Sequence, residues 1–134
     1  MRKRLVGVMM AVGSMVMLAV PAMAHHSFTA EFDDRKPVEL KGVISKIDWI
    51  NPHVYIFLDV KDEAGKVTTW ALECHPTHWF TKAGLKKSML GEGQTVTVSA
   101  FGAKDGSTVL AYTRRITYAD GHFYQLFTDD AVLH

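Results

Sequence analysis

Two adjacent histidines near the start of the chain carry side chains suited to metal chemistry. They form the run His25-His26-Ser27, directly after the small-residue triplet Ala22-Met23-Ala24. If a signal peptidase cleaves after Ala24, His25 offers one metal ion both its α-amino group, with an ordinary pKa of about 8, and a ring nitrogen. Nitrogen donors in a near-planar arrangement suit Cu(II). The sequence therefore predicts a copper site formed by His25, His26 and His53, with other candidates for the last imidazole at His75, His78 and His122.

A plainer interpretation of the same run is a polar, solvated start to the processed chain, because terminal residues are commonly poorly ordered. His53 also has an alternative role, in which its ring forms hydrogen bonds at the rim of a β-rich fold. Both alternatives stay open at the level of sequence.

A second group of metal-capable side chains occupies the segment from Glu73 to His78. Cys74, His75 and His78 form a secondary candidate metal cluster, but Pro76 makes the local backbone hard to predict. A structural zinc site normally uses two separated ligand pairs, and no second Cys/His pair follows. The alternative is a helix start beside a buried Cys74, which is the sole cysteine of the chain and has no partner for an intramolecular disulfide.

Aromatic side chains on two expected strands form a candidate ligand platform, consisting of Trp49, Tyr55, Phe57 and Trp70. The alternative is a second apolar layer, or a covering for the N-terminal arm. The sequence contains no glycine-rich phosphate loop, nucleophile elbow or zinc-protease helix. Solvated charges are expected to explain most of the carboxylates, which include Glu31, Asp33, Asp34, Glu73 and Asp105. We therefore predict no catalytic residues.

The first 24 residues have the layout of a secretory signal peptide. Arg2, Lys3 and Arg4 precede an apolar run of 16 residues, which is shorter than the roughly 20 that span a bilayer. We expect cleavage after Ala24, a periplasmic or secreted protein and no stable membrane span; a retained anchor is the alternative. Cleavage removes these three basic residues and no acidic ones, so the formal charge falls from +1 to −2. That balance argues against nucleic acid as a partner.

Hydrophobic alternation predicts an all-β domain over residues 38–134, preceded by an extended arm over residues 25–37. Strands are expected at 38–49, with a bulge or bend near Gly42, and at 54–60, 67–73, 94–101 and 108–117, with a further segment at 122–127. Pro76 and Gly84 bracket a short helix between the third and fourth strands. This order predicts an OB-like barrel of five to six antiparallel strands, with a plain β-sandwich as the alternative.

Several motifs together resemble an uncharacterised family of exported bacterial proteins, known as domain of unknown function 6152. They are the start His25-His26-Ser27-Phe28, Glu31-Phe32-Asp33, Lys36-Pro37, Gly42, Trp49 with Asn51-Pro52-His53, Trp70 with Glu73, and the run from Ala103 to Ser107. The resemblance spans nearly the whole processed chain and implies a small exported β-domain. It implies no activity. The segment from Cys74 to His78 is richer in metal ligands than its counterpart in the family.

We thus expect a non-enzymatic binding module whose partner is a small ligand or another periplasmic protein, with copper as the one candidate cofactor. An adaptor domain that binds a periplasmic protein without metal, through its aromatic arm or a sheet edge, is the alternative. A copper-dependent oxidase is a third hypothesis.

Overall fold

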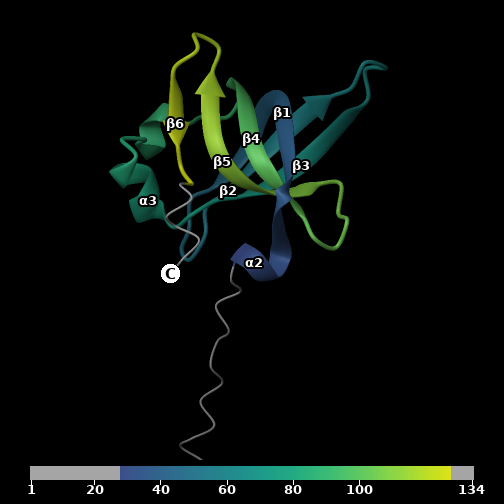
Figure 1. Cartoon of the computed structure of the whole chain (residues 1–134). Coiled ribbons are helices and arrows are strands. Elements are labelled where there is room, and N and C mark those ends of the chain that lie inside the picture. Colours follow the sequence, from purple (N-terminus) through teal and green to yellow (C-terminus); the bar gives the residue numbers. More distant parts are fainter. Residues whose placement is uncertain (1–27, 128–134) are drawn as a thin grey trace, which may run out of the picture.

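A computed structural model describes residues 28–127 (Figure 1). The predicted signal peptide, His25 and His26 therefore lie outside the described residues. The elements in chain order are α2 (Phe28–Glu31), β1 (Phe32–Asp48), β2 (Tyr55–Lys61), β3 (Val67–Glu73), α3 (Thr77–Lys82), the 3-10 turn η1 (Lys87–Met89), β4 (Thr95–Ala103), β5 (Leu110–Tyr118) and β6 (Phe123–Gln125). The predicted all-β class and the short helix between the third and fourth strands are confirmed.

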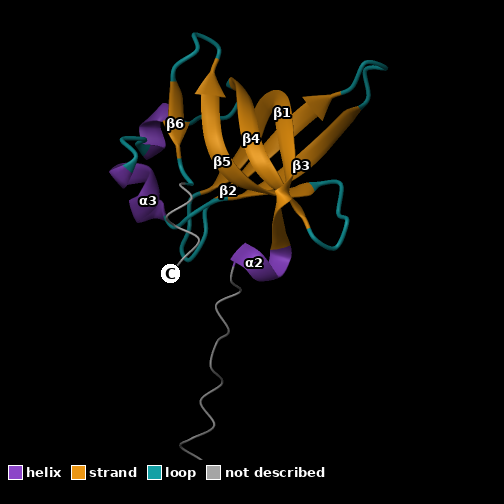
Figure 2. Cartoon of the chain, in the orientation of Figure 1, coloured by secondary structure: helices purple, strands orange, loops and turns teal. Residues whose placement is uncertain are grey.

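The strands pair in a closed ring, as the strand colouring in Figure 2 lets the reader follow. β1 is 17 residues long and pairs with β4 through its first part and with β2 through its last part. β2 pairs with β3, and β4 pairs with β5. A short parallel pairing of β3 with β5 completes the ring, whereas the other pairings are antiparallel. β6 then adds to the edge of β5 beyond the part that β3 covers.

The hydrophobic core fills the inside of this ring. Side chains alternate along each strand, so β2 sends Ile56 and Leu58 inward, and both are fully buried. α3 adds Phe80, whose ring meets Trp49 edge-on at 4.9 Å between centroids. Burying each such side chain stabilises the fold by about 1.5–3 kcal/mol. Pro76 precedes α3, and Gly84, with a φ of +85°, follows its end, as the sequence predicted.

The N-terminal segment is more structured than the predicted arm. Phe28–Glu31 forms a helical turn, and β1 begins at Phe32, six residues before the expected start of the domain at Val38. The reason is an aromatic cluster at this end of the ring, formed by Phe28, Phe32, Phe101, Tyr112 and Phe127. Burial of these rings offsets the conformational entropy lost on ordering the segment.

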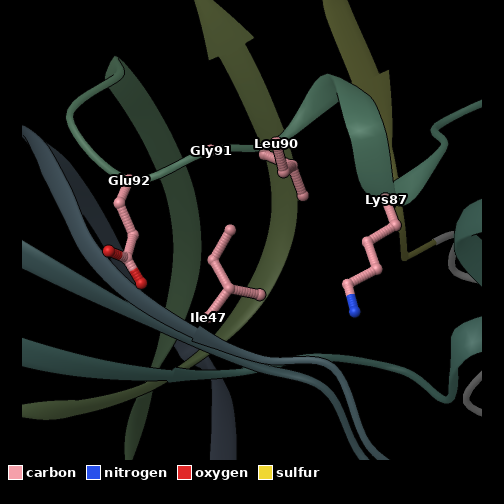
Figure 3. A pocket seen from close by; sticks show the side chains of 5 residues that line it. All are labelled: Ile47, Lys87, Leu90, Gly91 and Glu92. Atoms are coloured by element: carbon pink, nitrogen blue, oxygen red, sulfur yellow. The ribbon is translucent and has the colours of Figure 1, made fainter.

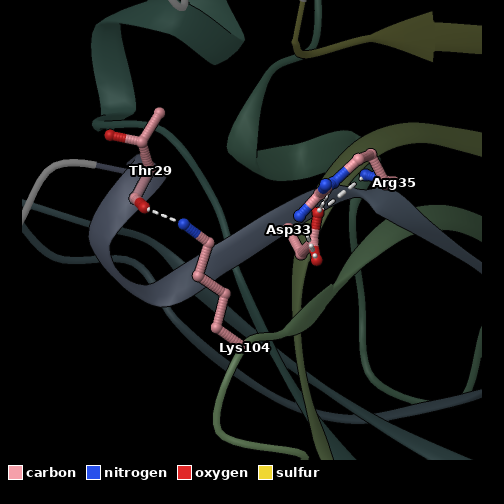
Figure 4. A network of polar contacts seen from close by, with 4 residues as sticks. All are labelled: Thr29, Asp33, Arg35 and Lys104. Carbon is pink, nitrogen blue, oxygen red and sulfur yellow. Dashed lines mark hydrogen bonds and ion pairs between the residues drawn. The ribbon is translucent and has the colours of Figure 1, made fainter.

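Polar contacts fasten the same segment to the loop after β4 (Figure 4). The Lys104 Nζ donates to the Thr29 carbonyl at 2.5 Å, and the Lys104 backbone N–H donates to the Glu31 carbonyl at 2.8 Å. On β1, Asp33 accepts hydrogen bonds from the side chain and backbone of Arg35, which hold the pKa of Asp33 below its usual value. The start of the described chain is thus held against the ring. Within residues 28–127, no helix is long and apolar enough to cross a membrane.

Gly42 lies close to the irregularity predicted for the first strand, and it allows β1 and β2 to approach closely. The shift in register between these strands falls between Ile44 and Lys46, a few residues further on. A Cβ atom at position 42 would lie 2.4 Å from the Asp59 carbonyl oxygen, closer than such atoms can approach. Only glycine therefore fits where β1 turns from β4 towards β2.

Replacing Gly42 with alanine should lower the free energy of unfolding by about 2–3 kcal/mol, because the strands must move apart in a packed region. Urea unfolding followed by fluorescence measures the change. Gly91→Ala is the matched control, since the nearest atom to a Cβ there is 4.0 Å away. Equal stability of the two variants would contradict this role for Gly42.

Candidate functional site

A cluster of polar side chains lies on the outer face of the ring, at the end where α2 sits. Tyr55 on β2 pairs in register with Glu73 on β3, which pairs in turn with Tyr112 on β5. Partners in register share a face of the sheet, so these three side chains project from the same side. Together with His53 and His75 they form what we call the polar cluster.

Glu73 is the centre of the polar cluster, and only 8% of its surface is exposed. Its Oε2 accepts a hydrogen bond of 2.9 Å from the Tyr55 hydroxyl, and its Oε1 lies 2.5 Å from the Nδ1 of His53. Burial raises the pKa of Tyr55, and the hydrogen bond to Glu73 and the charges of Glu73 and Glu31 raise it further. Tyr55 therefore remains a neutral donor. Most carboxylates were expected to be solvated charges, and Glu73 is an exception.

His53 is held so that one ring nitrogen is available. Its Nδ1 is buried and lies against the Glu73 carboxylate without the geometry of a hydrogen bond, and the two form an ion pair only when the ring is protonated. A carboxylate oxygen only accepts, so the tautomer of neutral His53 that suits this neighbour has its proton on Nδ1 and its lone pair on Nε2. The side chain is 30% exposed. A carboxylate behind the Nδ1 of histidine is the usual support for a metal-ligating imidazole.

The loop that carries His53 is tied to the start of α3. The Asn51–Pro52 peptide bond is cis, and the Asn51 side-chain oxygen accepts hydrogen bonds from the hydroxyl and the backbone N–H of Thr77. Val54 then pairs with the segment after β3, because its carbonyl accepts from the Cys74 N–H at 2.9 Å and its N–H donates to the His75 carbonyl. These contacts bring the two histidine-bearing segments side by side.

His75 is the second imidazole of the polar cluster. Its Nδ1 lies 3.0 Å from the Tyr112 hydroxyl, and its ring stacks on Trp79 at 4.7 Å and on Phe127 at 5.6 Å. Burial lowers the pKa of His75 to about 4, with smaller contributions from His53 and His78. Its Nε2 is buried and has no hydrogen-bond partner in the part of the chain that the structure describes. His75 is therefore a neutral ring at pH 7 with one unsatisfied nitrogen.

The other predicted ligands lie apart from one another. Cys74 is fully buried in the core, where its Sγ is 3.3 Å from the Thr113 hydroxyl, while His78 is exposed on α3. His122 occupies the turn before β6, where it pairs with Asp120 and stacks on Tyr118. Across residues 28–127, no three His, Cys, Asp or Glu side chains gather in a way that could hold a metal ion. The structure does not assemble the secondary cluster of Cys74, His75 and His78.

The predicted aromatic platform divides between the two faces of the sheet. Tyr55 and Phe57 project outward, and Phe57 receives the Lys46 ammonium at 5.1 Å from its ring centroid. Trp70 is paired with Leu58, so it lies on the core face, and Trp49 packs against Phe80. The pairing register between β2 and β3 places Trp70 on the face opposite to Tyr55 and Phe57, which alternation within a single strand could not decide.

A surface pocket lies elsewhere, between β1 and the segment that joins η1 to β4 (Figure 3). It is lined by Ile47, Lys87, Leu90, Gly91 and Glu92, with the two charged side chains at opposite ends of an apolar floor. It shares no residue with the polar cluster. Its lining offers no histidine or cysteine, so its chemistry is confined to weak polar and apolar contacts.

The ring of strands and its carboxylate–histidine–tyrosine cluster define a small all-β protein with a candidate ligand site at one end. Residues 12–111 match a family model described as "Family of unknown function (DUF6152)", and the chain belongs to this family. The resemblance noted from the motifs is thereby confirmed. No curated protein and no solved structure matches the chain.

Acid should destabilise the metal-free protein through His75. The His75 ring is protonated near pH 6.5 in the unfolded chain but only near pH 4 in the folded chain. Between these pH values the unfolded state therefore binds more protons, and the free energy of unfolding falls as the pH drops. Urea midpoints between pH 7 and pH 4 measure the slope, which His75→Phe should reduce. NMR titration of the His75 ring with a midpoint near 6.5 would contradict the prediction.

Cys74 should resist thiol reagents in the folded protein. Burial raises its pKa to about 12, so almost no thiolate forms at pH 8. We expect a chromogenic disulfide reagent to label Cys74 only in denaturant, releasing one equivalent of the reagent's coloured thiol per chain. Rapid labelling of the native protein, measured by absorbance, would contradict this.

Proposed function

We propose that this protein is an exported OB-like binding module that carries a copper site at its N-terminal end. The closed order β1–β2–β3–β5–β4, with a helix between β3 and β4, supports the OB-like assignment. The basic, apolar and small-residue regions of residues 1–24 support export. The proposed metal ligands are His25, His26 and His53.

The observation that carries this proposal is the pairing of His53 with the buried Glu73. A buried carboxylate beside one ring nitrogen fixes the orientation of the imidazole and increases the basicity of the other nitrogen. Tyr55 satisfies the second oxygen of the same carboxylate. A histidine with only a structural role at the rim of the fold would need no buried carboxylate, because water could form the hydrogen bonds of its ring nitrogens.

The start of the described chain lies beside the polar cluster. The ring of Phe28 is 5.2 Å from that of Tyr112, whose hydroxyl contacts His75, and the charge of Glu31 acts on Tyr55. His26 and His25 precede Phe28 by two and three residues. An extended chain spans about 3.3–3.6 Å per residue, so both histidines are within roughly 10 Å of that anchor. The proposal requires that His25 and His26 reach His53 from this anchor.

The proposal is for binding rather than catalysis. The supporting features are ligand-orienting contacts, namely an ion pair, a hydrogen bond and stacked rings. The two competing functions, copper oxidase and metal-free adaptor, differ in what the protein does with copper. A copper oxidase would turn over a reductant once loaded, whereas an adaptor would function without metal.

Cu(II) titration of protein that begins at His25, verified by mass, tests the proposal. We expect one-to-one binding with a nitrogen-rich electron paramagnetic resonance (EPR) spectrum. An alanine added ahead of His25 should weaken binding more than tenfold by removing the chelating amine. Glu73→Gln should weaken it by about 10–100-fold, as loss of such a support does elsewhere.

His122→Ala is the control, because His122 lies near the end of β5 that is remote from Tyr112. Its variant should bind copper as the wild type does. Weak binding that is unchanged by the added alanine and by Glu73→Gln would reject the copper site and favour the adaptor. Sustained ascorbate oxidation by the loaded protein would favour the oxidase.

A further inference from the structure

We infer that Met89 is a site of reversible oxidation, where the oxygen of methionine sulfoxide accepts hydrogen bonds that the thioether sulfur accepts only weakly. Met89 ends the turn η1 and is 37% exposed, so solvent reaches this residue. It is the sole methionine of residues 25–134, and the only cysteine, Cys74, is fully buried. The inference uses no residue of the proposed copper site and goes beyond that function.

The Met89 side chain takes the place of an oxygen acceptor at the start of η1. Lys86 is the N-cap residue of this turn, and its backbone N–H donates to the Met89 sulfur at 3.5 Å. In the usual form of this reciprocal contact, called a capping box, the acceptor is the side-chain oxygen of a glutamate or glutamine. A thioether sulfur is a weak acceptor by comparison. The motif is therefore present in a form that lacks its strong acceptor.

A second donor reaches the same sulfur from β6. The Tyr124 hydroxyl donates to the Met89 sulfur at 3.5 Å. The Tyr118 hydroxyl, at the end of β5, donates to the Met89 carbonyl at 3.0 Å, and the two tyrosine rings meet edge-on with their centroids 6.0 Å apart. Met89 thus links η1 to both strands, and its sulfur lies where donors from two separate segments meet.

Oxidation by a peroxide supplies the missing acceptor. The sulfur lone pair forms an S–O bond while the O–O bond of hydrogen peroxide breaks, and the leaving hydroxide takes the proton of the transferred oxygen and departs as water. The sulfur loses two electrons, and the peroxide gains them. Methionine sulfoxide is polar and disturbs packing when it forms inside a core. At the exposed Met89 its oxygen is within reach of the Lys86 N–H and the Tyr124 hydroxyl, so oxidation strengthens the link between η1 and β6.

The oxidised turn borders the surface pocket of Figure 3. Lys87 and Leu90, which lie on either side of Met89 in the sequence, both line that pocket. A firmer link between η1 and β6 holds this wall of the pocket in place. The oxidation state of Met89 is therefore coupled to the pocket, which shares no residue with the polar cluster.

Treatment of the metal-free protein with hydrogen peroxide tests the inference. A chelator excludes copper, which would itself generate stronger oxidants. We expect peptide mass spectrometry to find one added oxygen on Met89, and a methionine sulfoxide reductase to remove it. The thermal unfolding midpoint of the oxidised protein should rise by about 2–5 °C, because two weak hydrogen bonds to sulfur are replaced by stronger ones to oxygen.

Three variants isolate the contacts of the new oxygen. Met89→Gln carries a permanent side-chain oxygen at this position, so its midpoint should exceed that of the wild type without oxidant. Tyr124→Phe removes one donor, so oxidation should raise its midpoint less than that of the wild type. Met89→Leu is the matched control, because it keeps the apolar volume without sulfur, and its midpoint should not rise on treatment.

Several results would overturn the inference. One is a midpoint that falls equally in oxidised wild type and oxidised Tyr124→Phe, because the sulfoxide would then only disturb the turn. Another is a Met89 that stays unmodified at peroxide concentrations that oxidise free methionine. A third is Met89→Gln that is less stable than Met89→Leu. None of these results depends on copper, so this inference and the copper site can fail separately.

Discussion

The short parallel pairing between β3 and β5 is the constraint on which the rest of the structure depends. It joins Ala71, Leu72 and Glu73 to Leu110, Ala111 and Tyr112. The pair Leu72 and Ala111 points inward, where both side chains are fully buried and close the core. The last pair turns outward and brings Glu73 beside Tyr112. One backbone contact thus completes the hydrophobic interior and assembles the polar cluster on its other face.

A buried carboxylate is costly unless donors surround it, and the fold supplies them from separate elements. Tyr55 lies at the start of β2, and His53 lies in the loop just before it. Removing either partner would leave a poorly compensated charge, with a cost of a few kcal/mol. The aromatic cluster around Tyr112 excludes water on this side, and the lower local dielectric strengthens each remaining polar contact.

Local patterns predicted much of the fold. Alternation identified β2 through Ile56 and Leu58, and Pro76 with Gly84 bracketed α3. The polar cluster was less predictable, because the partnership of Glu73 and Tyr112 depends on a pairing between residues 39 positions apart in sequence. His53 was predicted as a site residue from its type and loop position, but no local signal marked Glu73 as buried. Trp70 was grouped with Tyr55 because pairing register, which decides the face, is set by the partner strand.

The contact between Phe28 and Phe127, whose ring centres are 4.9 Å apart, joins the two ends of the described chain. A pulling force applied to those ends would first load this clasp of aromatic rings, and the ladder of backbone hydrogen bonds only afterwards. Contacts between aromatic rings separate one after another, whereas the backbone hydrogen bonds of strands pulled along their length share the force. His75 and Tyr112 of the polar cluster both contact the Phe127 ring of this clasp, so tension on the two ends acts directly on the candidate site.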